Sequence, residues 1–228
     1  MAKEDNNVTK SSNVISLLRW PIVTLLSLII FYAPIAQLVK NVGQFSVDRN
    51  GGDWKLQFTV AAALADATIN SGKTNDESNS QIHKAVFNTK NTIENATTPD
   101  VLNILRGSKV LWVDDNPENN VSERNSFETL GINFEISLST EDAISKIKNG
   151  NFSAIISDMR RGEKDMAGYE LLDALKSFGP NPPLVFYTAS STPQFQEEAR
   201  KRGAFGETNS PSELFALVVA AIQSRAKR

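Results

Sequence analysis

The feature that most constrains this chain is an apolar run that ends on two adjacent acids, residues 110–116, with the sequence VLWVDDN. Four consecutive apolar residues indicate a strand covered on both faces, as in parallel sheets with helices on each side. In such sheets the functional crevice lies beyond the carboxyl ends of the strands, where we expect Asp114 and Asp115. Because neighbouring carboxylates repel each other unless a cation intervenes, the pair predicts an oxygen-ligated divalent ion, with Mg²⁺ as the default candidate.

Two later runs end in a similar way. Residues 152–158, FSAIISD, end on Asp158, and residues 183–189, PLVFYTA, end on the hydroxyl of Thr188 followed by a small residue. The stretch between the first two runs has helical spacing, so strands and helices alternate. Since parallel strands bring their carboxyl ends to one edge, three carboxylates and a hydroxyl could converge there.

The periodicity predicts an α/β domain over residues 107–228, a doubly wound five-stranded parallel sheet. We place strands near 109–113, 132–136, 153–157, 183–187 and 204–207, and helices near 117–130, 140–149, 168–178, 193–202 and 211–226.

This ordered set resembles the receiver domain of two-component response regulators, whose fold is flavodoxin-like. That family has an acidic pair after strand 1, a phosphoacceptor Asp after strand 3, Thr or Ser with Ala after strand 4, and Lys-Pro after strand 5. The resemblance implies that Asp158 accepts a phosphoryl group and that Thr188 binds a phosphoryl oxygen. It also implies Mg²⁺ bound mainly by Asp115, with Asp114, Asp158 and the main-chain carbonyl of Arg160 completing the site. A histidine kinase or phosphotransfer protein is the implied partner, and we expect a phosphoacceptor rather than an enzyme.

Strand 5 departs from the family pattern. When the chain is aligned on its Gly-Ala and on Pro211, the lysine position holds Ser210 and the switch-aromatic position holds Glu207. The missing lysine does not forbid metal binding or slow phosphorylation, but it undermines the usual coupling of phosphorylation to conformational change.

The loop after Asp158 is longer than the family's common form and carries three basic residues, Arg160, Arg161 and Lys164. One of them could replace the missing charge, but we expect each of them on a solvated surface.

Residues 20–39 contain no charged residue and are bracketed by Arg19 and Lys40. This length matches the roughly 20 residues that cross a hydrocarbon core. We predict one transmembrane helix over residues 20–40 after a flexible tail, 1–19; a buried helix of a soluble domain is the alternative. The flanking basic residues tie, so orientation rests on the resemblance, which implies a receiver facing the cytoplasm.

The intervening region, 41–106, reads as a small mixed or helical linker. Apolar and polar residues alternate from Trp54 to Val60 as in a short strand, and residues 60–69 favour a helix. A further helix over 80–96 carries an apolar side, Ile82, Val86, Phe87 and Ile93, which suits either a homodimer contact or packing on its own domain.

The charge and the cysteine content exclude some classes of partner and site. A formal charge of −2 argues against nucleic acid as the main partner, and the absence of cysteine excludes disulfides and thiolate metal sites.

The leading hypothesis is a membrane-anchored receiver in a phosphorelay, without a separate output domain. The alternative is a pseudo-receiver, a tethered interaction or ligand-sensing module without phosphoryl switching. A haloacid-dehalogenase-like phosphatase would need Asp-x-Asp after the first strand, which the sequence does not supply.

Overall fold

The computed structural model describes residues 54–70 and 79–227, which lie within one compact unit, Asp48–Arg228. The predicted tail, 1–19, and the predicted membrane helix, 20–40, fall outside the described residues. Within 54–70 and 79–227, none of the helices is both long enough and apolar enough to cross a bilayer.

Five parallel strands form the sheet: β1 (Lys109–Val113), β2 (Asn133–Ser137), β3 (Ala154–Ser157), β4 (Leu184–Tyr187) and β5 (Gly206–Thr208). Their order is β2-β1-β3-β4-β5, which is the flavodoxin-like order and confirms the predicted doubly wound fold. The strand order reverses beside β1, so the crevice of such a fold opens between the ends of β1 and β3.

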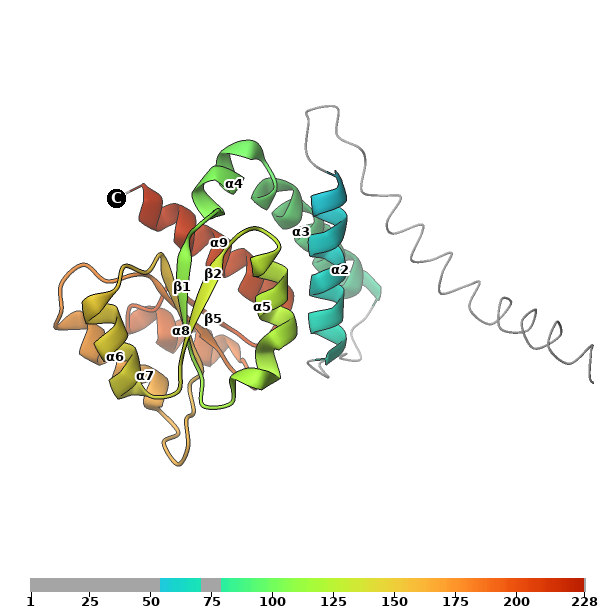
Figure 1. Ribbon diagram of the computed structural model, residues 1–228. Helices are drawn as coiled ribbons and strands as arrows, with labels where there is room; N and C mark the ends of the chain where they lie inside the picture. Colours follow the sequence, from blue (N-terminus) through green and yellow to red (C-terminus); the bar gives the residue numbers. More distant parts are fainter. Residues whose placement is uncertain (1–53, 71–78, 228) are drawn as a thin grey trace, which may run out of the picture. The chain divides into compact units, whose positions relative to one another are not determined.

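Helices cover both faces of the sheet (Figure 1). They are α5 (Val121–Glu128), α6 (Thr140–Asn149), α7 (Ala167–Lys176), α8 (Pro193–Lys201) and α9 (Pro211–Ala226), and a short 3₁₀ helix, η1 (Pro117–Asn120), precedes α5. Helices α6 and α7 lie on one face, and α5 and α9 lie on the other. The predicted helices are therefore present, with ends that differ by a few residues.

Alternate residues of β1 supply two separate layers of core. Leu111 and Val113 belong to a buried cluster with residues of α6, α7 and α8. Trp112 belongs to an aromatic layer on the opposite face, where its ring meets Phe134 edge-on at 5.7 Å and Tyr187 at 6.2 Å. Because every residue from Val110 to Val113 is buried, the strand end is held firmly and the acids that follow it have a fixed starting point.

The described residues before the sheet form the helices α2 (Trp54–Asn70), α3 (Asn79–Ala96) and α4 (Pro99–Leu105). The predicted strand from Trp54 to Val60 is wrong, because these residues begin α2. The buried side chains of α2 follow three- and four-residue spacing, Gln57, Val60, Leu64 and Ala67, whereas Phe58 is 48% exposed. Burial of one helical face outweighs the short alternation that suggested a strand.

Helix α3 packs on α9 and α2 of its own chain, and Ile93 and Ala96 are fully buried. The other residues of its predicted apolar side, Ile82, Val86 and Phe87, have side chains outside the described part. For the end of α3 that carries Ile93, packing on its own domain accounts for the apolar residues, and the homodimer contact stays a prediction.

Candidate functional site

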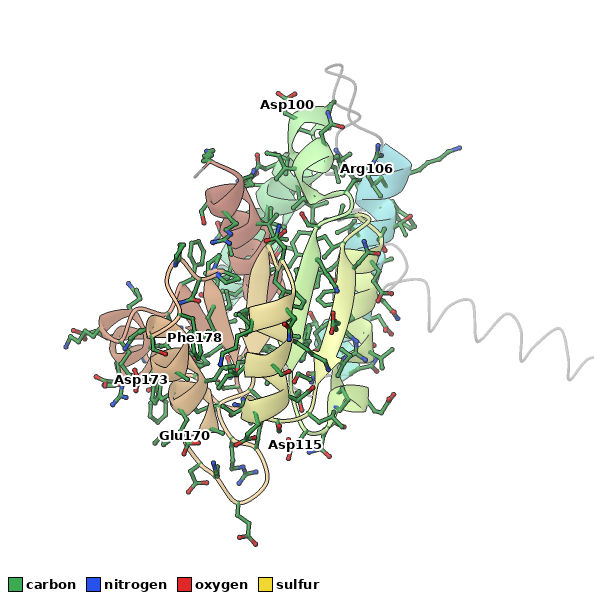
Figure 2. The ribbon with its side chains drawn as sticks, turned by 60° about the vertical axis from the view of Figure 1, so that its left-hand side comes forward. Asp100, Arg106, Asp115, Glu170, Asp173 and Phe178 are labelled. Carbon is green, nitrogen blue, oxygen red and sulfur yellow. The ribbon has the colours of Figure 1, made fainter. Side chains whose placement is uncertain are left out.

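Three carboxylates converge at the edge of the sheet where the strand order reverses. Asp114 and Asp115 follow β1, Asp158 follows β3, and one oxygen of each lies within 4.8 Å of one from each of the others. Figure 2 shows Asp115 at one end of the sheet and Arg106 at the other. The acids line a cavity of about 540 Å³, which we call the acidic cavity; the remaining lining residues are Asn70, Asn116, Asn119, Asn120, Glu123, Arg160, Gly162, Tyr187, Thr188 and Ala189.

Asp114 is buried, and its neighbours fix both of its oxygens. The Asn116 main-chain N–H donates to Oδ1 at 2.7 Å, and the Asn120 side-chain amide donates to Oδ2 at 2.7 Å. Asn120 ends η1, and sequence reasoning did not single it out. The available signal was the polar run from Asn116 to Asn120 directly after the acids, since asparagine in such turns bonds to nearby acceptors.

Asp115 contacts the long loop after β3. Its Oδ2 accepts a hydrogen bond from the main-chain N–H of Gly162 at 2.8 Å. Gly162 has φ +57°, in the left-handed region that glycine adopts at little cost. The loop therefore turns back across the site, and a side chain at this position would strain the turn.

Burial and the charge of Asp114 raise the pKa of the Asp158 carboxyl from 3.8 to about 6. Hydrogen bonds from the main-chain N–H groups of Met159 and Arg160 and the charge of Arg161 act in the opposite direction; the Met159 bond to Oδ1 is 2.7 Å long. The balance means that the ionised form lies in an unfavourable environment. A cation beside it would offset that cost.

The donor set fits Mg²⁺. Hard carboxylate oxygens at the ends of two adjacent strands are the ligands this ion prefers, and the cavity is polar enough for the water it retains. Arg160 also lines the cavity.

Arg161 is buried, which corrects the prediction that it lies on a solvated surface. Its guanidinium donates to the main-chain oxygens of Asp158 at 2.6 Å and Ala167 at 2.8 Å, and to the hydroxyls of Ser157 and Thr140 at 2.8 and 2.7 Å. Burial lowers its pKa, and the nearby acids raise it. Arg161 thus links the start of the loop to β3, α6 and α7. Its hydrogen bond to Asp158 is made to the main-chain oxygen.

The other two basic residues of the loop are exposed, as predicted. Arg160 is exposed, and Lys164 forms an ion pair with Glu170 at 2.9 Å in which both side chains are at least half exposed. Neither is buried where the family's lysine would be.

Thr188 lies at the edge of the acidic cavity, and a buried carboxylate holds it. Its Oγ1 is 2.7 Å from Glu207 Oε1 and 2.8 Å from the main-chain oxygen of Ser190. Glu207 Oε2 accepts from the hydroxyl of Ser191 at 2.7 Å, so both carboxylate oxygens are occupied. The residue at the switch-aromatic position therefore points inward and binds the hydroxyl expected to meet a phosphoryl group.

Ser210 precedes α9, and its hydrogen bonds are made with residues 208–214 on either side of it. Its N–H donates to Thr208 Oγ1 at 3.0 Å, and its hydroxyl lies 3.1 Å from that of Ser212. Among the described residues that line the acidic cavity, Arg160 is the one with a cationic side chain. Within the part of the cavity lining that the structure describes, no buried cationic side chain takes the place of the lysine that the family has at the end of strand 5.

One further buried pair lines the cavity and was missed by sequence reasoning. The hydroxyl of Tyr187 donates to Glu123 Oε1 at 2.8 Å, which joins the end of β4 to α5. Burial and the charge of Glu123 raise the pKa of Tyr187, so the phenol stays protonated. The alternation of β4 could have indicated that Tyr187 faces α5, but its partner could not be read from the sequence.

Comparison with known proteins finds one matching family and several similar structures. Residues 110–220 match the family described as the response regulator receiver domain. Among curated proteins, none matches the chain. Similar solved structures include a receiver domain from Francisella (24% identity, TM-score 0.47, covering 52% of this chain and 98% of that one) and one from Methanospirillum hungatei JF-1 (21%, 0.46, 53% and 97%). Another is the N-terminal domain of a response regulator/sensory box/GGDEF protein from Carboxydothermus hydrogenoformans (26%, 0.43, 53% and 98%).

Proposed function

Because residues 110–220 are a response regulator receiver domain, we propose that this protein accepts a phosphoryl group on Asp158 and acts in two-component phosphorelay signalling. Receiver domains typically interact with histidine kinases or phosphotransfer proteins, and we assign a partner of this kind to the chain. The observation that carries the proposal is the meeting of three carboxylates and the Thr188 hydroxyl in one polar cavity.

The reaction that suits this geometry is in-line transfer. An Asp158 carboxylate oxygen attacks the phosphorus of a phosphohistidine, the P–O bond forms as the P–N bond breaks, and the electron pair returns to the imidazole nitrogen. Mg²⁺, held by Asp114, Asp115, Asp158 and the main-chain carbonyl of Arg160, would offset negative charge on the transferring oxygens. Thr188 would donate to one of those oxygens after leaving Glu207.

Membrane attachment is a further part of the proposal. The uncharged block at residues 20–39 supports a single-pass anchor, and the need for a cytoplasmic phosphoryl donor supports a receiver that faces the cytoplasm. Alkaline carbonate extraction of membranes tests the anchor, since an integral protein stays in the pellet. Protease added to intact cells tests the orientation, since a cytoplasmic receiver is spared.

The second candidate is a pseudo-receiver, an interaction or ligand-sensing module that keeps the fold without phosphoryl switching. The observation that favours it is the bond between Glu207 and Thr188, because a buried carboxylate occupies the hydroxyl and adds negative charge beside the site. The absence of a lysine at Ser210 points the same way.

Intact-mass analysis of the full chain, treated with a small phosphodonor and Mg²⁺, separates the two candidates. We expect the addition of one phosphoryl group, lost in Asp158→Asn and retained in Asp165→Asn, an exposed acid of the same loop. No mass increase in the wild-type chain, together with normal cellular function of Asp158→Asn, would favour the pseudo-receiver.

A further inference from the structure

The acidic cavity has a wall that lies outside the matched receiver domain. Asn70, the last residue of α2, lines this cavity together with the three acids. Helix α2 ends well before residue 110, where the family match begins. A side chain from the preceding helical region therefore reaches the place where phosphoryl transfer is proposed.

Helix α2 is docked through a continuous apolar face. Val60, Leu64 and Ala67 are buried at helical spacing, and Gln57 extends the same stripe. The helix packs along α5 and also contacts α9 (Figure 1). Because this face is buried against the receiver, the position of Asn70 depends on how α2 sits on α5.

Two polar contacts join the end of α2 to the first turn of α5. The Asn70 side-chain amide donates to Ser122 Oγ at 2.9 Å, and Ser122 Oγ donates to Asp66 Oδ2 at 2.8 Å. Ser122 lies in the first turn of α5, two residues after Asn120, which fixes Asp114 Oδ2. The start of α5 and the residue before it therefore contact both α2, through Ser122, and Asp114, through Asn120.

We propose that Asn70 is a positioning residue of the acidic site and that docking of α2 on α5 is coupled to occupancy of the cavity. This inference rests on the proposed phosphoacceptor function. An amide offers both an acceptor and donors to the water that Mg²⁺ retains, and through Ser122 it holds the segment that carries Asn120. Binding in the cavity then favours the docked helix, and the docked helix favours binding.

The coupling makes α2 a regulatory element between the N-terminal part of the chain and Asp158. A change that loosens α2 weakens the acidic site, and a filled site tightens α2, because thermodynamic linkage acts equally in both directions. The first effect is an input from the N-terminal part, and the second is an output toward it.

The test measures Mg²⁺ binding and the exchange of α2 amide hydrogens in the full chain. We expect Asn70→Ala to raise the Mg²⁺ concentration for half-maximal thermal stabilisation about five-fold or more, the lower end of typical couplings. Mg²⁺ with beryllofluoride should slow hydrogen exchange over residues 57–70 in the wild-type chain, and Asn70→Ala should reduce that slowing. Asn91→Ala, an exposed asparagine of α3, is the matched control and should behave as wild type.

A second variant keeps Asn70 in place. Ala62 is exposed in the middle of α2, so Ala62→Gly weakens the helix without altering the cavity. Coupling predicts weaker Mg²⁺ binding in this variant too, which a purely local role of Asn70 does not. If the wild-type chain responds to Mg²⁺ and both variants respond identically, the coupling is overturned and the phosphoacceptor function stands. If the wild-type chain responds neither to Mg²⁺ nor to beryllofluoride, the proposed function fails and the coupling fails with it.

Discussion

The Thr188 hydroxyl lies 2.7 Å from Oε1 of the buried Glu207, so the group that we propose to meet a phosphoryl oxygen is held by a carboxylate. A hydroxyl has one proton, and it cannot donate to Glu207 and to a phosphoryl oxygen at once. In the proposed reaction Thr188 therefore has to release Glu207, and the phosphoryl group would bring further negative charge toward that side chain. The departure at the switch position would thus oppose the proposed phosphorylated state.

Replacing Glu207 by Gln should ease that release. Hydrogen bonds to charged groups contribute about 1.5 to 3 kcal/mol and neutral ones about 0.5 to 1.5, so the variant should bind a phosphoryl mimic more tightly by about 1 kcal/mol, roughly five-fold. Thermal melting during a beryllofluoride titration in Mg²⁺ measures this.

Glu213→Gln is the matched control for that experiment, because Glu213 is also bound by a threonine hydroxyl, that of Thr208 at 2.6 Å. Glu213 does not line the acidic cavity. Equal titration curves for Glu207→Gln and wild type would show that the carboxylate does not compete with the phosphoryl group.

Restoring the family's lysine should strengthen the response to phosphorylation. Ser210→Lys adds a charged contact of about 1.5 to 3 kcal/mol to the phosphorylated state. The change removes little from the fold, since the Ser210 hydroxyl does not cap α9. We expect a larger beryllofluoride-induced rise in melting temperature than in wild type. Ser212→Lys, in the first turn of the same helix, controls for added charge; an equal rise there would contradict a specific role of position 210.

The sequence predicted the sheet because each strand carries its own signal. The buried run from Val110 to Val113 and the runs before Asp158 and Thr188 are local patterns, and parallel topology alone brings their ends together. The wrong strand prediction at residues 54–60 also came from a local pattern. The seven residues alternate between apolar and polar as in a strand, but packing against α5 decides which face of the segment is buried, and that packing is not visible in the local sequence.

The polar contacts of the site could not be predicted in the same way. Arginine is mostly exposed, which favours a solvated Arg161, but four acceptors surround it in the fold: one each on β3, α6 and α7 and one on Asp158. The Asn70 contact joins residues that are 52 positions apart. Neither set of partners leaves a spacing pattern, because side-chain networks depend on how whole elements pack.

Arg161 should be required for the shape of the loop after β3. Arg161→Lys keeps the charge but cannot reproduce the fork of four hydrogen bonds, and it leaves the main-chain oxygens of Asp158 and Ala167 poorly paired. We expect a loss of about 1.5 to 3 kcal/mol in the free energy of unfolding, the range for one hydrogen bond to a charged group. Denaturant titration measures it.

The same variant should also weaken Mg²⁺ binding, because the loop carries the Gly162 N–H that contacts Asp115. Arg200→Lys is the matched control, since Arg200 is exposed on α8 and does not line the acidic cavity. Normal stability of Arg161→Lys would contradict the anchoring role.

The raised pKa of Asp158 predicts a pH-dependent stability in the absence of metal. Folding raises this pKa from 3.8 to about 6, so the folded state holds the proton more tightly than the unfolded chain. The contribution of this group to the stability of the fold is therefore fully present below about pH 4 and is lost as pH rises through about 6.

Asp158→Asn removes the ionised form, and in EDTA at pH 7.5 it should exceed wild type in stability by about 1 to 2 kcal/mol, after allowance for solvent screening of a partly exposed carboxyl. Near pH 3.5 the two proteins should be equally stable. Denaturant titrations at both pH values measure the difference, and Asp165→Asn should show no such pH-dependent gain. A gain that persists at pH 3.5 would place its cause outside the ionisation of Asp158, whereas a gain that disappears on adding Mg²⁺ at pH 7.5 would show that the cation relieves the same repulsion.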